Sequence, residues 1–124
     1  MEFRDNKAIY LQIAEYVCEH ILLGKWKVDE KVPSVREMAV DLEVNPNTVM
    51  RTYELLQNKN IINNKRGIGF FVAEDALAQV KSYRKTQFMD DELPMVFRNL
   101  YLLNIGFDEL EARYQTFVKE TFNP

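Results

Sequence analysis

Cysteine and histidine are almost absent from this chain. Its 124 residues include one cysteine, Cys18, and one histidine, His20. A single cysteine cannot close a disulfide within the chain, and the two residues do not make up the ligand set of a metal site. We therefore expect no metal site. Cys18 is expected to be a small buried residue of a helix, and His20 a surface residue near the end of that helix.

Long apolar runs are missing too. No run approaches the roughly 20 residues that a transmembrane helix needs, and the polar start at residues 1–5 does not resemble a signal peptide. Hydrophobic residues make up 47% and charged residues 28% of the chain, which is the balance of an ordinary globular protein. These features predict a cytoplasmic protein with no membrane partner.

A catalytic site is not expected either. The acidic residues are scattered along the sequence, and with a single histidine they form no group of nucleophile, base and orienting residue. An enzyme is the weakest functional class for this chain, and no cofactor is expected.

The formal net charge of −3 at first argues against DNA binding, but the charge is unevenly distributed. Residues 1–73 carry ten basic and ten acidic residues, whereas residues 74–124 carry six and nine. Residues 44–73 have a local charge of +3, from one acid, Glu54, and four basic residues, Arg51, Lys59, Lys65 and Arg66. The global charge therefore hides a basic region.

Two helices are predicted in the first part of the chain. Apolar residues recur at steps of three and four between residues 5 and 23, which predicts an amphipathic helix that ends before Gly24. Ser34, followed by Glu37 three residues later, predicts a capping box at the start of a second helix. Trp26 lies between the two helices, and we expect it to pack as an anchor under the second.

A third helix is predicted to start at Asn45-Pro46, with a side-chain cap and a proline at the first helical position. One side of it is apolar, and the opposite side carries Asn47, Arg51, Glu54 and Asn58, with Thr48 at its edge. Amide, hydroxyl and guanidinium groups near a helix N-terminus suit the DNA major groove, where arginine binds guanine and asparagine binds adenine. A merely solvated face is an equal alternative for this helix taken alone.

A β-hairpin is predicted directly after this helix. Residues 60–64 and 70–72 have β character, and they flank a basic turn, Lys65-Arg66-Gly67-Ile68-Gly69. The order of helices and hairpin is that of a winged helix-turn-helix, whose hairpin follows the DNA backbone or enters the minor groove. A nucleotide-binding glycine loop is disfavoured, because the third glycine and the following helix of that motif are missing.

Together these motifs closely resemble the N-terminal DNA-binding domain of the GntR family of bacterial transcription regulators. The resemblance covers about residues 7 to 73 and rests on six segments, residues 9–14, 21–26, 33–39, 44–49, 53–56 and 66–72. It implies operator contacts by Ser34, Arg36, Asn45, Asn47, Thr48, Arg51, Arg66 and Gly67, and we add the neighbouring cation Lys65. Where the family usually has glycines, this chain has Asp29 and Asn60; asparagine tolerates a left-handed backbone, so Asp29 is the larger change.

The C-terminal part is predicted to be a separate unit, with residues 1–73 forming the winged helix-turn-helix and residues 74–124 a helical tail. Helical spacing appears over residues 73–89, 93–103 and 108–118, with Asp90-Asp91-Glu92 expected to break the first helix. Pro94 suits the start of the second helix, and Asp108 with Glu111 predicts a capping box for the third.

The tail holds eight of the fifteen aromatic residues, which need a partner to cover them. It resembles the tail of the YtrA subfamily of these regulators, where it serves as a dimerisation module. The residues expected at such an interface are Leu77, Val80, Phe97, Leu100, Tyr101, Tyr114 and Phe117. A tail that folds back on its own winged helix is the alternative.

The predicted fold is therefore mainly α with a small β-hairpin, a winged helix-turn-helix followed by a short helical dimerisation tail. The leading functional hypothesis is a homodimeric, sequence-specific repressor that binds an inverted-repeat operator in double-stranded DNA. The alternative is a winged-helix module that binds protein and has no specific DNA target. A small aromatic pocket between tail helices could also hold an apolar small-molecule effector, whose identity the sequence leaves open.

Overall fold

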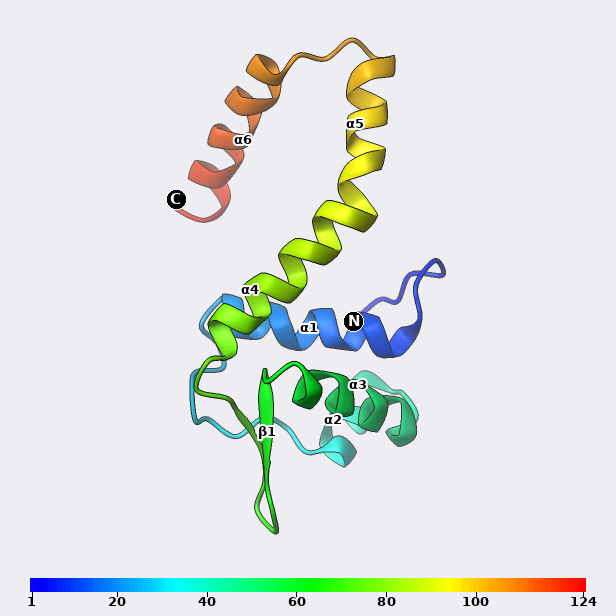
Figure 1. Cartoon of the computed structure of the whole chain (residues 1–124), viewed down its shortest axis with the longest axis vertical. Helices are drawn as coiled ribbons and strands as arrows, with labels where there is room; N and C mark the ends of the chain where they lie inside the picture. Colours follow the sequence, from blue (N-terminus) through cyan, green and yellow to red (C-terminus); the bar gives the residue numbers. More distant parts are fainter. The chain divides into compact units, whose positions relative to one another are not determined.

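The computed structural model describes all 124 residues and divides them into two compact units, residues 1–86 and 87–124. The first unit contains α1 (Ile9–Leu22), α2 (Val35–Leu42), α3 (Pro46–Asn58), β1 (Ile62–Lys65), β2 (Gly69–Val72) and nearly all of α4 (Ala76–Gln87) (Figure 1). The second contains a π-helical turn (Phe88–Glu92), α5 (Leu93–Leu102) and α6 (Phe107–Thr121). A mainly helical fold with one hairpin is confirmed.

The core of the first unit holds α3 against its neighbours. α3 packs on both α1 and α2, and Tyr53 and Val49 on its inner side are fully buried. The buried Thr52 hydroxyl donates to the backbone oxygen of Tyr10 in α1 at 2.7 Å, and the Tyr53 hydroxyl donates to Pro33 O at 2.6 Å. These two bonds fix α3 relative to α1 and to the start of α2.

The helix starts predicted for α2 and α3 are confirmed. The Ser34 hydroxyl accepts from Glu37 N at 3.0 Å, while Ser34 N donates to the Glu37 carboxylate at 2.9 Å, which completes the capping box. Asn45 caps α3 by accepting from Asn47 N at 2.8 Å. Satisfying these free N–H groups sets where each helix begins.

The two unusual turn residues keep a left-handed backbone. Asp29 has φ +66° and Asn60 has φ +60°. Glycine adopts this conformation most easily, and Asp29 adopts it too. Aspartate in place of the glycine expected here therefore leaves the direction of the turn unchanged.

α1 begins later than the apolar spacing predicts, at Ile9 and not near Asp5. The Gln12 amide donates to the backbone oxygens of Arg4 and Lys7 at 2.7 and 2.8 Å, and its oxygen accepts from Arg4 N at 2.7 Å. This buried side chain draws the preceding residues into a turn, which replaces the first helical turn.

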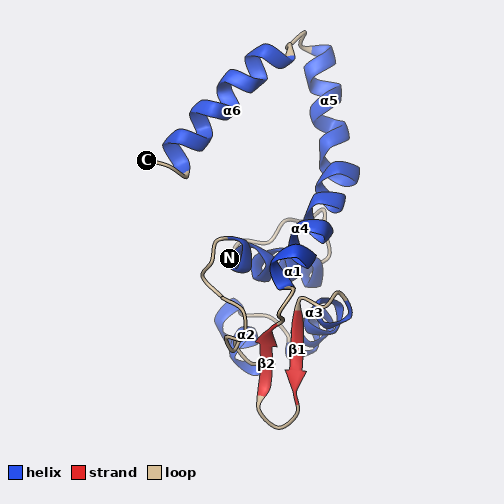
Figure 2. Ribbon diagram, turned by 60° about the vertical axis from the view of Figure 1, so that its left-hand side comes forward, coloured by secondary structure: helices blue, strands red, loops and turns tan.

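The hairpin is antiparallel, with Ile62 opposite Val72 and Lys65 opposite Gly69. Ile62 and Val72 are buried at its base. Lys31 adds an isolated antiparallel bridge to Phe71. Figure 2 shows the hairpin extending past α2 and α3, with its turn at the far end.

α4 belongs mainly to the first unit, so the boundary lies after Thr86 and not after residue 73. Ala76 and Val80 on α4 are fully buried in the core of the winged helix. The apolar spacing of α4 showed that one face is buried, but it could not show which unit covers that face.

Trp26 packs differently from the prediction. Its ring lies 4.6 Å from the His20 ring and 6.4 Å from the Tyr16 ring, measured between centroids, and both partners lie on α1. The anchor expected under α2 therefore stacks on the end of α1, and His20 is half-buried between two aromatic rings.

Two predictions for the second unit are wrong. Asp90, Asp91 and Glu92 do not break the helix but form the π-helical turn that leads into α5. The turn contains no glycine or proline that would end the helix. Pro94, which follows the turn, has no N–H, so one backbone hydrogen-bond donor is missing just after it. α6 starts at Phe107 with Gly106 as its N-cap, and no side-chain cap is present, so the capping box of Asp108 and Glu111 does not form.

None of the helices combines the length and the hydrophobicity of a membrane span.

Candidate nucleic-acid interface

The first turns of α3 present polar side chains away from the core. Asn47 and Arg51 are exposed, Thr48 is half-buried at the edge, and the exposed Asn45 uses its carbonyl oxygen as the cap. The Asn45 cap leaves the amide N–H₂ of that side chain available as a donor. Donors and acceptors are therefore grouped at the N-terminal end of α3, the end that reads bases in helix-turn-helix proteins.

Arg51 has a partner that the sequence did not predict. Its guanidinium carbon lies 3.8 Å from the centre of the Tyr10 ring, close enough for a cation–π stack. The two residues are brought together because α1 packs along α3.

Met50 is a second residue of this surface that the sequence did not predict. It is 40% exposed and directly precedes Arg51 in α3. An apolar side chain at this place can contact the methyl group of thymine. Its exposure can be inferred from the helical period, but apolar residues are normally assigned to the core side.

α2 contributes Arg36 and Ser34. Arg36 is exposed in the first turn, as predicted, whereas Ser34 is half-buried and uses both its hydroxyl and its N–H in the capping box. The pKa of Glu37 is lowered, first by the hydrogen bond from Ser34 N–H and then by the bond to the Ser34 hydroxyl. Glu37 therefore stays ionised at the N-terminus of α2, where a negative charge is favourable.

The wing has an exposed cationic tip. Arg66 and Gly67 are exposed, and Lys65 Nζ lies 4.3 Å from the centre of the Phe71 ring. Gly67 has φ +80°, which a residue with a side chain adopts only with strain. The tip can thus offer its backbone and two cations to a phosphate chain.

Lys31 adds a third cation to the wing. A β-carbon on Gly69 would lie 2.9 Å from Lys31 Cε, so the lysine stem crosses the wing directly over this glycine. Nothing in the sequence near Lys31 signals this position, because the contact depends on the bridge between Lys31 and Phe71.

The predicted dimerisation residues separate into two groups. Val80 is fully buried in the core of the first unit, so its side chain has no surface to offer a second copy. Leu77, Phe97, Tyr101, Tyr114 and Phe117 are exposed, and Leu100 is half-buried.

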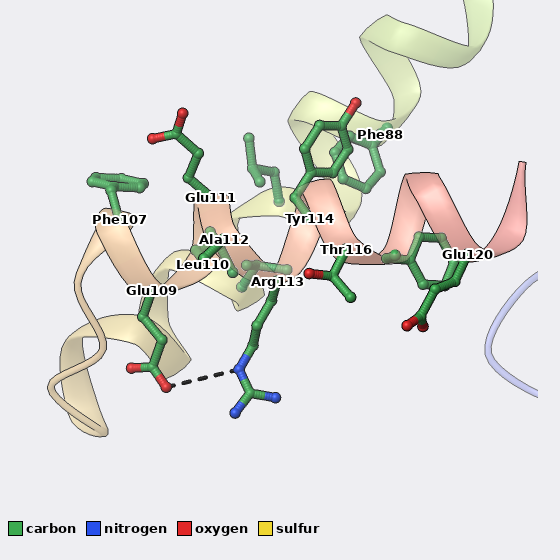
Figure 3. Close-up of a pocket in the computed structure, with 13 residues that line it drawn as sticks. Phe88, Phe107, Glu109, Leu110, Glu111, Ala112, Arg113, Tyr114, Thr116 and Glu120 are labelled. Carbon is green, nitrogen blue, oxygen red and sulfur yellow. Dashed lines mark ion pairs between the residues drawn. The ribbon is translucent and has the colours of Figure 1, made fainter. Parts of the chain in front are cut away.

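The second unit contains an open groove of about 1200 Å³, larger than the small pocket expected between the tail helices. Figure 3 shows the side chains of α6 along it, together with the ion pair between Glu109 and Arg113. Its apolar lining residues are Phe88, Leu93, Val96, Phe107, Leu110, Ala112, Tyr114 and Phe117.

Cys18 is a fully buried core residue, as predicted. Burial raises the pKa of its thiol from 9.0 to about 12, which leaves it protonated and unreactive. No group of three or more His, Cys, Asp or Glu side chains is arranged to hold a metal ion.

Comparison with known proteins agrees with this geometry. Residues 9–72 match the family model of bacterial regulatory proteins of the gntR family. The helix-turn-helix (HTH) transcriptional regulator YhcF of Bacillus subtilis is 32% identical over 118 residues, which cover 95% of this chain and 96% of YhcF. The HTH-type transcriptional repressor YtrA of the same organism is 35% identical over 102 residues, which cover 82% of this chain and 72% of YtrA.

A solved structure is similar as well. A protein from Bacteroides thetaiotaomicron assigned to the GntR family is 50% identical and superposes with a TM-score of 0.70, over 91% of this chain and 98% of that chain. The predicted resemblance to the GntR family and to YtrA is therefore confirmed. The chain belongs to the GntR family of bacterial transcription regulators, and it is a DNA-binding regulator of transcription.

Proposed function

We propose that this chain is a homodimeric repressor that binds an inverted-repeat operator, with one α3 helix in the major groove of each half-site. Asn47 and Arg51 contact base edges, with Asn45 and Thr48 beside them. Phosphates are contacted by Arg36 at the start of α2, beside the capping residue Ser34, and by Lys65, Arg66 and Gly67 at the wing tip. Two copies related by a twofold axis require half-sites about 10 base pairs apart, or a multiple of that.

The observation that carries the dimer is the exposure of the second unit. None of the residues from 87 to 124 is buried, although this stretch contains seven aromatic residues. Tyr101 is 84% exposed and Phe107 is 69% exposed. Because apolar surface gains about 25 cal/mol for each Å² removed from water, a partner that covers these helices stabilises them considerably.

The partner we propose is the same unit of a second copy, seated in the groove beside α6. Phe117, Tyr114 and Val96 line that groove and remain exposed, so matching helices from a second copy can bury them. A twofold interface uses the same patch on both copies, which a single exposed apolar face provides. Phe97, Leu100 and Tyr101 extend the proposed interface along α5. Leu77 on α4, in the first unit, is exposed as well, and we propose that it also contacts the second copy.

The proposed sign of regulation is repression. YtrA, which shares 35% identity over 102 residues, is named a transcriptional repressor. A dimer seated on a promoter obstructs polymerase without any further contact.

In vitro selection of a preferred duplex, followed by gel-shift assays at several salt concentrations, tests the DNA-binding part. We expect an inverted repeat, one dimer for each duplex, and affinity that falls steeply with salt because phosphate contacts release counterions. In vitro transcription from a promoter that contains the selected site should then decrease. A selected site without twofold symmetry would contradict the proposal.

Sedimentation velocity tests the dimer. We expect a dimer at micromolar concentration in the absence of DNA. A monomer would favour the alternative in which the tail folds back on its own winged helix, or a groove that holds an apolar small molecule.

A further inference from the structure

The stack between Tyr10 and Arg51 leaves the N–H donors of the guanidinium available. The ring covers one face of the guanidinium at 3.8 Å from ring centre to Cζ. A guanidinium carries its five N–H donors in its plane, so a stack on the face does not consume them. Arg51 makes no side-chain hydrogen bond or ion pair within the chain.

Tyr10 is itself fixed to the helix that carries Arg51. Its backbone oxygen accepts the 2.7 Å hydrogen bond from the hydroxyl of Thr52, the residue next to Arg51. Thr52 is fully buried, and Tyr10 is half-buried in the second position of α1. The backbone that carries the ring is therefore held against α3, and the half-buried ring lies against the Arg51 guanidinium.

A stacking surface carried by a neighbouring helix matters for an arginine that reads a base. A free arginine samples many rotamers, and ordering a long side chain on binding costs affinity. Bidentate bonding to guanine also requires the guanidinium plane to lie near the plane of the base, and a stack restricts that plane before DNA arrives.

We propose that Tyr10 is a positioning residue for Arg51, which holds the guanidinium with its donor edge directed to the operator. This inference rests on the proposed role of Arg51 as a base contact. It assigns to α1, which carries none of the proposed DNA contacts, an influence on sequence preference at a single base pair.

The experiment uses the full chain, a duplex obtained by in vitro selection, and single-base-pair variants of that duplex. The proteins are wild type, Tyr10→Phe, Tyr10→Leu, Arg51→Ala and the double variant Tyr10→Leu/Arg51→Ala. Fluorescence anisotropy at one salt concentration gives the affinity for each duplex, and thermal unfolding shows that each protein is folded at the assay temperature. Tyr10→Met also fills the space without an aromatic face, and it provides a second measurement if Tyr10→Leu does not fold.

We expect Tyr10→Leu to weaken binding about two- to tenfold, the range for the ordering of one long side chain. The preference should weaken at the same base pair that Arg51→Ala affects and nowhere else. Tyr10→Phe should bind like the wild type, because the ring face remains. In the Arg51→Ala background, Tyr10→Leu should cause no further loss.

Full base preference in a folded Tyr10→Leu protein overturns the inference. So does an equal loss of affinity with and without Arg51, because Tyr10 would then act structurally or through its own contact. In both cases the effect of Arg51→Ala, and with it the proposed function, is unaffected. Two other results would contradict the proposed function itself: a wild-type chain that shows no salt-dependent DNA binding, or an Arg51→Ala variant that keeps every base preference. In either case Arg51 is not a base contact, and the inference about Tyr10 fails with it.

Discussion

The stem of Lys31 crosses the wing over Gly69, with Lys31 Cε 2.9 Å from the place where a β-carbon on residue 69 would stand. Residue 69 also has φ +139°, a backbone conformation that is almost confined to glycine. The close approach of Lys31 and the backbone of the hairpin both depend on this glycine.

Gly69→Ala is therefore expected to destabilise the chain by about 1 to 3 kcal/mol, mainly through backbone strain, because the flexible end of Lys31 can move aside. DNA affinity should fall as well, since the wing and Lys31 both shift. Urea unfolding and gel-shift assays measure the two effects. Ile68→Ala, at an exposed neighbouring position, is the control and should leave stability nearly unchanged; equal stability of Gly69→Ala and Ile68→Ala would contradict the explanation.

Alanine substitutions of Arg51 and Arg66 are expected to weaken DNA binding in different ways. Arg51→Ala should cost about 1 to 3 kcal/mol on the selected duplex and relax the preference at one base pair. Arg66→Ala should weaken all duplexes alike and reduce the salt slope by about one, since one phosphate contact is lost. Affinities over a salt series on selected and random duplexes separate the two patterns. Lys81→Ala on α4, an exposed cation outside the proposed interface, is the control; normal binding by both arginine variants would remove these site assignments.

Local signals predict much of the local structure around the candidate interface. The Ser34 and Glu37 box, the Asn45 cap and the hairpin around Gly67 each depend on residues a few positions apart, so the sequence contains the whole interaction. The stack of Arg51 on Tyr10 depends on the packing of α1 against α3, which no local pattern describes.

Helical periodicity has a similar limit in the tail. It predicted correctly that Val80 and Phe117 lie on the apolar faces of helices, but Val80 is covered by its own unit and Phe117 is 57% exposed. A periodic pattern shows that one face prefers to leave water, and it does not show what covers that face. The break predicted at the acidic run ending at Glu92 is wrong for a related reason. Polar residues alone do not end a helix, and this run contains no glycine or proline.

The turn at Asp29 offers a stabilising substitution. Asp29 has φ +66°, and its N–H donates to Val72 O at 3.0 Å, which joins the turn to the hairpin. Asp29→Gly relieves the left-handed strain and keeps that backbone bond, so we expect a gain of up to about 1 kcal/mol. Asp29→Ala, which removes the same charge without the conformational relief, is the matched control. Thermal unfolding that shifts equally for both variants would assign the effect to charge.

Cys18 gives the stability of the fold a dependence on alkaline pH. Desolvation by burial raises the pKa of its thiol from 9.0 to about 12. A raised pKa means that the folded state keeps a proton that the unfolded state releases, so this contribution is complete below pH 9 and is lost as the pH rises toward 12. Urea unfolding of wild type and Cys18→Ala, from neutral to moderately alkaline pH, should show a steeper decline for wild type. Parallel curves would mean that the thiol does not titrate as its burial requires.

Val80 and Phe117 provide the sharpest test of how the two units differ. Val80→Ala opens a cavity in the core of the first unit, so the free energy of unfolding should fall by about 2 kcal/mol while the dimer constant stays the same. Phe117→Ala removes an exposed ring that lines the groove, so it should leave the first unit intact and raise the dimer dissociation constant at least about tenfold, as the loss of a central aromatic contact does. Urea unfolding followed at the Trp26 fluorescence reports on the first unit, and sedimentation velocity over a dilution series reports on the dimer.

Because operator binding by a twofold protein depends on both copies, Phe117→Ala should also weaken binding to the full inverted repeat much more than to a single half-site. Equal effects on the two duplexes would mean that Phe117 does not contribute to the dimer.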